Sequence, residues 1–265
     1  MFDFAYCRAG SVAEAVAAFE DAEDGTYLAG GMTLVPVLKQ RLAAPSTVIN
    51  LGGISELSGI AVEDNRLVIG ALVPHDTVAR STVVLDTIPA LAALAGAIGD
   101  PQVRNRGTLG GSVANNDPAA DYPAGVLALG ATIHTDRRKI TAEAFFTGLF
   151  ETALEPGELV TRVSFPIPVK AGYARFRQAA SGYPLVGVFV AETGEGPRVA
   201  VTGAGPGVFA VPEMEAALAA DFSAGALEGI AVPADGLNFD LHGSAEYRAH
   251  LVSVMAGRAV AIANG

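Results

Sequence analysis

The stretch that decides the fold runs from Val103 to Ala131 and reads VRNRGTLGGSVANNDPAADYPAGVLALGA. It is rich in glycine and small polar residues, and it then becomes apolar over Tyr122–Leu129, a pattern that predicts a helix. Thr108–Ser112 has so little side-chain bulk that a ligand could lie directly against the backbone N–H groups. A lone TLGG is more often a plain turn between two packed elements. Taken alone, the stretch leaves both interpretations open.

A second small-residue loop favours the ligand interpretation. Ala29–Leu34 reads AGGMTL, so each of the two Gly-Gly pairs has a threonine hydroxyl beside it. Strands expected at 26–28 and 47–51 flank a helix expected at 33–42, which places this loop at a helix N-terminus. Free N–H groups and the helix dipole favour an anion there. Two such loops suit a ligand with two adjacent phosphates.

The composition excludes several classes of protein. Of the 265 residues, 51% are hydrophobic and the mean hydropathy is +0.39, yet no segment approaches the ~18–20 uninterrupted apolar residues of a membrane span. Subunit contacts would account for the apolar excess, as would a large core with many alanines. The net charge of −11, without a basic stripe, disfavours nucleic-acid binding. The N-terminus MFDFAYCRAG lacks an export signal, so we expect a cytoplasmic protein.

The chain carries no local catalytic constellation. Its one cysteine, Cys7, cannot form an internal disulfide or hold an iron–sulfur cluster alone. The four histidines lack metal-ligand spacing, and no lysine follows a Gly-rich loop. The run Gly203–Gly207 (GAGPG) has a misplaced third glycine and a proline where a donor is needed, so it predicts a turn. Any redox chemistry should therefore belong to a cofactor.

The proline pair at 166–168 predicts a domain boundary. We expect one domain over residues 1–170 and a second over 171–265. Further elements are expected on either side of it. They are a helix over 12–19, a hairpin of strands 60–62 and 66–69, helices 77–80 and 88–98, strands 131–134, 158–165, 174–178, 185–191 and 198–202, and helices 212–220 and 244–263.

Three segments together resemble a known family. AGGMTLVPVLK, RNRGTLGGSVANNDPAADYPAGVLALGA and DLHGSAEYRAHL…RAV are similar to the medium, FAD-binding subunits of the molybdenum hydroxylases, over nearly the whole chain and in the same order. The resemblance implies an α+β fold. An FAD-binding domain of two subdomains, like that of the vanillyl-alcohol oxidase (PCMH) fold, would precede a small domain with a three-stranded sheet and helices.

The resemblance also implies the cofactor site. The residues that it assigns to FAD are Leu28, Ala29, Gly30, Gly31, Met32, Thr33, Leu34, Ile98, Thr108, Leu109, Gly110, Gly111, Ser112, Asn115, Asp121, Val160 and Arg177. The two loops would face the pyrophosphate, Asp121 the adenosine, and Ile98 the isoalloxazine ring. Asp121 could equally cap the helix that follows it, and Arg177 could equally be a solvated strand residue. No catalytic or metal-binding residue is expected.

The chain departs from the family pattern at three positions. Ser112 replaces the usual Asn, Asn115 replaces a small or hydroxyl residue, and Tyr183 replaces an acidic residue. They bear on the ring environment and the electron acceptor more than on FAD binding.

The family function would be electron transfer within a dimer of heterotrimers. Electrons would come from [2Fe–2S] clusters on a small subunit, and substrate would be oxidised at molybdopterin on a large subunit. The acceptor would be NAD, a quinone, a carrier protein or oxygen. The alternatives are a structural subunit that has lost its flavin and a stand-alone flavin oxidase.

Overall fold

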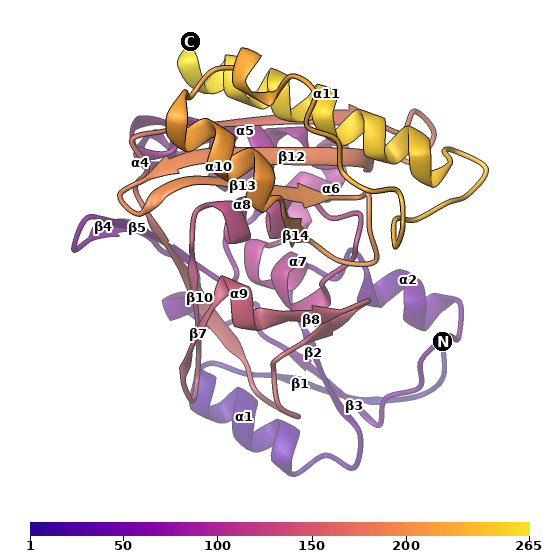
Figure 1. The fold of residues 1–265 in the computed structure, drawn as a ribbon. Coiled ribbons are helices and arrows are strands. Elements are labelled where there is room, and N and C mark those ends of the chain that lie inside the picture. Colours follow the sequence, from indigo (N-terminus) through magenta and orange to yellow (C-terminus); the bar gives the residue numbers. More distant parts are fainter.

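The N-terminal sheet is parallel, with strand order β1-β3-β2. Its strands are β1 (Ala5–Arg8), β2 (Gly25–Leu28) and β3 (Thr47–Asn50), and helices α1 (Val12–Glu20) and α2 (Leu34–Lys39) connect them. The computed structural model describes all residues, 1–265. The N-terminal sheet lies at one end of the molecule (Figure 1). Ser11 caps α1 by accepting a hydrogen bond from the Glu14 N–H at 3.2 Å. The sequence predicted α1, β2 and β3, but not the edge strand β1.

A five-stranded antiparallel sheet forms the middle of the molecule, with strand order β4-β5-β10-β6-β7. Its strands are β4 (Ile60–Glu63), β5 (Arg66–Gly70), β6 (Thr132–Thr135), β7 (Lys139–Thr141) and β10 (Val160–Pro166). Short elements follow β7: α9 (Ala142–Phe145), β8 (Phe146–Gly148) and β9 (Glu151–Thr152). The hairpin predicted for residues 60–69 is confirmed as β4 and β5.

Six short helices connect β5 to β6. They are α3 (His75–Arg80), α4 (Thr82–Thr87), α5 (Pro89–Ala97), α6 (Pro101–Arg106), α7 (Leu109–Asn115) and α8 (Tyr122–Ala128). The prediction of a loop over 108–112 is wrong in part. Thr108 caps α7, and residues 109–112 form the first turn of this helix. The Thr108 hydroxyl accepts a hydrogen bond from the Gly111 N–H at 3.1 Å.

The C-terminal sheet has four strands in the order β11-β12-β13-β14. They are β11 (Lys170–Arg177), β12 (Pro184–Thr193), β13 (Gly196–Thr202) and β14 (Phe209–Ala210), followed by α10 (Pro212–Ala220) and α11 (Ala245–Asn264). We expected three strands. The fourth has only two residues, between a Gly-rich turn and Pro212, and is too short to show alternation of apolar and polar residues.

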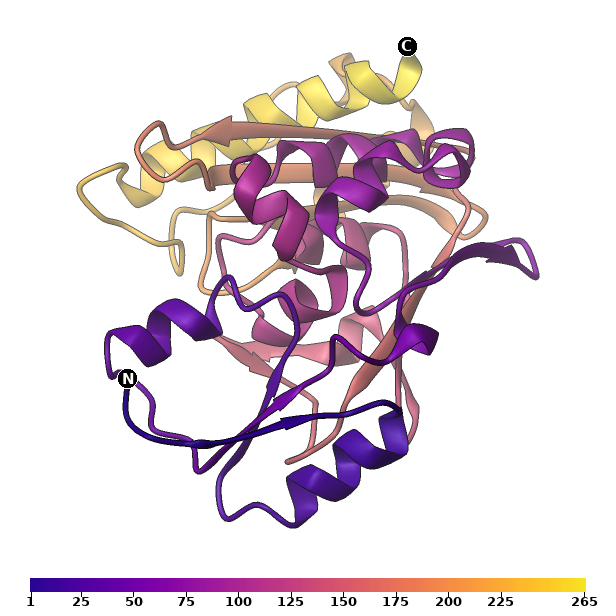
Figure 2. The ribbon, with the colours of Figure 1, turned by 180° about the vertical axis from the view of Figure 1, so that it is seen from behind.

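Helices cover both faces of this sheet. Helix α11 packs on β11 and β12 from one side, while α5 and α8 contact the sheet from the other (Figures 1 and 2). Alternate residues of β12 therefore enter two cores: Phe189 and Ala191 join the main core, and Val188 and Val190 join the C-terminal core. The main core thus crosses the expected boundary at residue 170. None of the helices is both long and apolar enough to cross a membrane.

Candidate cofactor-binding site

The two glycine-rich segments, 80 residues apart in sequence, lie against each other. A Cβ atom on Gly30 would lie 1.9 Å from the carbonyl oxygen of Arg106 and 2.9 Å from the Cα of Gly107. On the other side of the contact, a Cβ on Gly111 would lie 3.7 Å from the Cβ of Ala29. Only glycine allows backbones to approach this closely. The structure therefore brings the predicted loops together, and the absence of a side chain at Gly30 is the reason that it can.

The first loop carries unused backbone donors. The backbone N–H groups of Ala29 to Leu34 donate to no acceptor within the protein. Gly31 adopts φ +78°, which turns the chain between β2 and α2. Successive free N–H groups at the start of a helix form a concave anion site. This loop fits a pyrophosphate.

The N–H groups of the second segment are already used, which corrects our expectation of two donor loops. Leu109 and Gly110 donate to the carbonyl oxygens of Val73 and Ala71 at 3.1 and 2.9 Å. Gly111 and Ser112 donate to Thr108, to its hydroxyl and its carbonyl oxygen respectively. The Gly110 position packs so closely that a Cβ would lie 2.4 Å from the Cβ of Ala71. The second segment therefore shapes the site and supplies no free backbone N–H from these four residues.

The exposed side of α7 supplies polar side chains instead. Ser112 and Asn115 are three residues apart, so they share one face of the helix with Gly111, which faces the first loop. Both are partly exposed, and neither side chain has a hydrogen-bond partner within the protein. A hydroxyl and an amide are thus available opposite the free N–H groups.

Asp121 is engaged within the protein. Its carboxylate is 4% exposed and accepts hydrogen bonds from the Tyr173 hydroxyl at 2.6 Å and from Arg175 at 2.9 Å. Burial raises the pKa of Asp121, and Arg175 and Tyr173 oppose that shift. It makes no capping hydrogen bond to α8, so the helix-cap alternative is wrong. The carboxylate links α8 to β11 across residue 170.

Arg175 extends this cluster to the end of α5. Its guanidinium also donates to the carbonyl oxygen of Ala97, next to Ile98. Ile98 is partly buried, and its carbonyl oxygen accepts a hydrogen bond from Arg104 at 2.9 Å. The sequence analysis missed Tyr173 and Arg175. Arg175 lies two residues before Arg177 on β11, so alternation alone could not tell which arginine pointed inward.

The remaining expected residues differ in their exposure. Val160 belongs to the main core at 4% exposure, so its side chain does not face solvent. Arg177 is exposed at the end of β11 and forms no ion pair. Tyr183 lies in the turn after it, where burial raises the pKa of the phenol, with Asp117 and Asp121 adding to the effect. Pro118 and Tyr183 line a cavity of about 440 Å³.

The geometry agrees with comparisons to known proteins. Residues 2–168 match the family described as the FAD binding domain in molybdopterin dehydrogenase. The nicotine 6-hydroxylase medium subunit of Paenarthrobacter nicotinovorans is 35% identical, covering 96% of this chain and 95% of its own. The carbon monoxide dehydrogenase medium chain of Afipia carboxidovorans is 33% identical over 97% of this chain and 95% of its own. This chain is an FAD-binding medium subunit of the molybdenum hydroxylases.

Solved structures extend the match to the whole fold. Reconstituted CO dehydrogenase from Oligotropha carboxidovorans superposes with a TM-score of 0.90 at 32% identity, covering 98% of this chain and 97% of the other. Quinoline 2-oxidoreductase from Pseudomonas putida 86 gives 0.89 at 29% identity, covering 98% and 96%. The medium subunit is therefore an oxidoreductase subunit with FAD as its cofactor.

Proposed function

We propose that this medium subunit is an electron-transfer component and does not itself oxidise an organic substrate. It would receive electrons from [2Fe–2S] clusters on a small subunit and deliver them to an external acceptor. Substrate would be oxidised at molybdopterin on a large subunit, in a dimer of heterotrimers. Bound FAD supplies the electron-carrying chemistry, and this chain supplies the binding site.

The observation that carries the proposal is the set of free N–H groups from Ala29 to Leu34. We assign the FAD pyrophosphate to them, with Ser112 and Asn115 as further polar contacts. The close packing of Gly30 on Arg106 and Gly107 fixes the two segments relative to each other, and Gly110 packs the second segment onto Ala71. We keep Ile98 and Arg177 as ring-side candidates, and we keep residues 1–170 as the FAD-binding domain. Because Asp121 is held by Tyr173 and Arg175, we assign it to joining the two parts of the chain.

Thr33 offers a clean test of the pyrophosphate site. It is exposed, it occupies the N-cap position of α2, and its side chain makes no capping hydrogen bond. Thr33→Asp should leave the flavin-free chain as stable or slightly more stable, since a carboxylate at a helix N-terminus contributes about 0.3–1 kcal/mol. The same carboxylate should repel the pyrophosphate. A charge pair about 4 Å apart at an effective dielectric of 20 repels by about 4 kcal/mol, roughly a thousandfold in affinity.

The matched control is Thr33→Asn, which has nearly the same shape and no charge. Flavin absorbance per chain after purification is the measurement, with circular dichroism and thermal unfolding as the check on folding. We expect flavin in the wild type and Thr33→Asn and none in Thr33→Asp. Equal flavin in the two folded variants would place the pyrophosphate elsewhere.

The electron route needs a separate experiment. The isolated flavin-loaded chain is mixed anaerobically with the substrate of its native complex, before and after adding the partner subunits. We expect the flavin to bleach only after the partners are added. Bleaching by the isolated chain would support a self-sufficient oxidase instead.

A further inference from the structure

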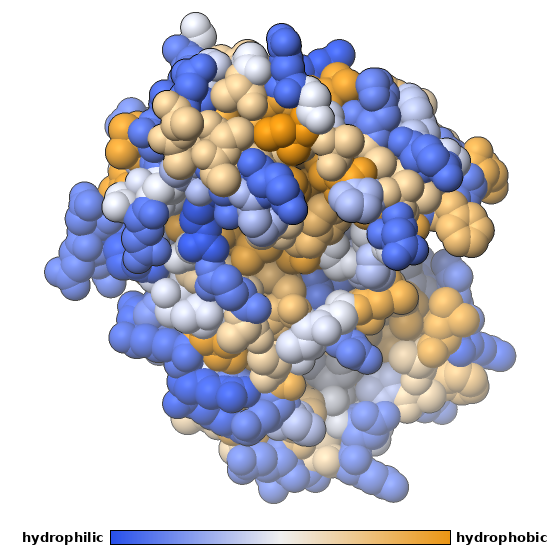
Figure 3. All heavy atoms as spheres, in the orientation of Figure 1, coloured by the Kyte–Doolittle hydropathy of each residue, from blue (hydrophilic) through white to orange (hydrophobic).

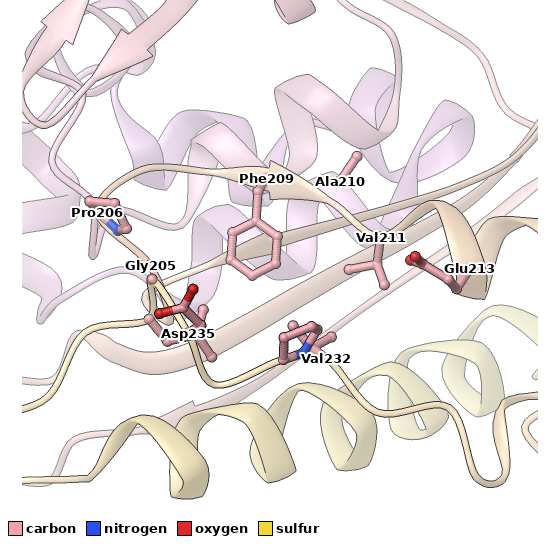
Figure 4. Close-up of a pocket in the computed structure, with 11 residues that line it drawn as sticks. Gly205, Pro206, Phe209, Ala210, Val211, Glu213, Val232 and Asp235 are labelled. Carbon is pink, nitrogen blue, oxygen red and sulfur yellow. The ribbon is translucent and has the colours of Figure 1, made fainter.

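A second cavity lies in the C-terminal part of the chain, away from the cofactor-binding segments. It has a volume of about 320 Å³ and lies between β14, the start of α10 and residues 232–237 (Figure 4). Phe209, Val211, Val232 and Leu237 provide its apolar lining, and Glu213 and Asp235 are its two charged residues. The volume is in the range of small-molecule sites, which combine an apolar lining with a few polar groups.

Hydrogen bonds hold the walls of this cavity in place. Asn238 fixes the segment before α11 against the turn after β13, through its N–H to the carbonyl oxygen of Ala204 at 2.8 Å and its side-chain amide to that of Gly205 at 2.7 Å. On the opposite wall, the Val211 N–H donates to Val199 at 3.1 Å. These hydrogen bonds hold the Gly205 and Val211 sides of the cavity in place without a ligand.

The charges of the cavity are of one sign and lack partners. The side chains of Glu213 and Asp235 form no ion pair or hydrogen bond within the protein, whereas the carboxylate of neighbouring Glu215 accepts a hydrogen bond from the Val199 N–H at 2.9 Å. Figure 4 shows Asp235 beside Gly205 and Glu213 beside the start of α10, with the Phe209 ring between the two ends. Two unpaired carboxylates around an apolar lining disfavour an anion and favour a cation with an apolar body.

The surroundings suit the same kind of ligand. Figure 3 shows apolar surface over α10, where the exposed apolar residues are a proline and alanines, with hydrophilic residues around it. The chain as a whole carries a net charge of −11, which attracts cations over a longer range. The Phe209 ring adds a surface on which a planar cation can stack.

We propose that this cavity binds a small organic cation, an amidinium, guanidinium or ammonium group carried on an aromatic or branched apolar body. The apolar body would lie on Phe209 and Val232, and the cationic group would pair with Glu213 or Asp235. This site is independent of FAD.

Benzamidinium is the probe, and neutral benzamide is its uncharged analogue. Binding to the purified flavin-loaded chain is followed by ligand-observed NMR and calorimetry. The variants are Glu213→Gln, Asp235→Asn and the double variant. Glu228→Gln is the control, because Glu228 is exposed in the same part of the chain but outside the cavity.

We expect saturable binding of benzamidinium, weaker at high salt, and binding of benzamide about as weak as that of benzamidinium to the double variant. An exposed ion pair contributes about 0.2–1 kcal/mol, so each single variant should bind up to about fivefold more weakly. The double variant should show both losses, while Glu228→Gln binds like the wild type. Flavin content should be the same in the wild type and in all four variants. A failure of this proposal can therefore be told apart from a failure of the proposed FAD site.

Three outcomes with the isolated chain would overturn the proposal. They are the absence of saturable binding, equal binding of benzamide, and wild-type affinity in the double variant. The probe is also tested on the chain within its native complex. If the complex blocks a site that the isolated chain has, a partner subunit occupies the cavity and the small-ligand proposal is wrong.

Discussion

His75 should make the stability of the chain depend on pH. Its backbone N–H donates to the Gly107 carbonyl oxygen at 3.0 Å, just before α7, and its ring lies 5.3 Å from that of Tyr122. The side chain is buried, and its Nδ1 atom has no hydrogen-bond partner. Burial lowers the pKa of His75 from 6.5 to about 4, with the charge of Arg104 adding to the effect. The folded chain therefore keeps this imidazole neutral.

The sign of the effect follows from proton uptake. Between pH 6.5 and about 4, the unfolded chain binds a proton at His75 that the folded chain does not. The unfolding free energy is therefore unaffected by His75 above the unfolded pKa, and it falls as the pH drops through this window. From a shift of this size, lowering the pH from 7.5 to 5 should remove about 2 kcal/mol of unfolding free energy, at 1.36 kcal/mol per pKa unit.

Urea unfolding of the flavin-free chain at pH 7.5 and 5.0 measures this loss. His75→Gln cannot take up the proton, so its unfolding free energy should fall by about 2 kcal/mol less than that of the wild type. Exposed His250 provides the control, and His250→Gln should follow the wild type. His134, whose pKa burial also lowers, contributes to all three proteins equally. The reasoning is refuted if His75→Gln and the wild type lose the same stability between the two pH values.

Three further substitutions test how the chain packs. Gly30→Ala should destabilise the chain by about 1–3 kcal/mol and release flavin, since its Cβ would overlap the Arg106 carbonyl oxygen. Gly96 lies inside α5, and a Cβ on it would lie 3.6 Å from the Cβ of Ala79, so Gly96→Ala should instead stabilise the chain by about 1 kcal/mol. Thermal unfolding and flavin content measure both, and destabilisation by Gly96→Ala would contradict the packing. Asp121→Asn leaves the largely buried Arg175 without a counter-charge and should lower the unfolding free energy by about 3–5 kcal/mol, measured by urea unfolding. A loss below about 1 kcal/mol would show that the pair is not buried in solution.

Periodicity predicted the elements whose burial is local. The helix expected at 212–220 is confirmed with the same bounds, because a proline at its first position and a run of strong helix formers mark it in sequence. The apolar run 185–191 is confirmed as part of β12, which is buried on both faces. Elements with short or mixed patterns were missed, such as β1 and β14. Strand β1 depends on pairing with β3, which lies beyond α1 and α2 in sequence, and β14 is a two-residue strand that pairs only with the end of β13.

The candidate site was predictable in its glycines and not in its long-range partners. Asp121 meets Tyr173 and Arg175, 52 and 54 residues later, and no local pattern indicates that meeting. The sequence therefore presented Asp121 as a free carboxylate beside a loop. The fold uses it instead to join α8 to β11, which removes it from the polar groups open to a ligand.

The two Gly-Gly pairs look alike in sequence but serve different physical needs. Around Gly30 and Gly31 the chain turns through a left-handed conformation and keeps its N–H groups free. Gly110, in contrast, lies in the first turn of α7 and donates its N–H to the carbonyl oxygen of Ala71, and a Cβ on it would lie 2.4 Å from the Cβ of Ala71. A glycine run thus signals that something approaches the backbone, and the approaching group can be an anion or another backbone. The N–H groups of residues 109–112 are bound within the protein, and Arg106 and Gly107 just before them pack against Gly30. The second segment can therefore position the first loop while leaving the N–H groups of that loop open to the pyrophosphate.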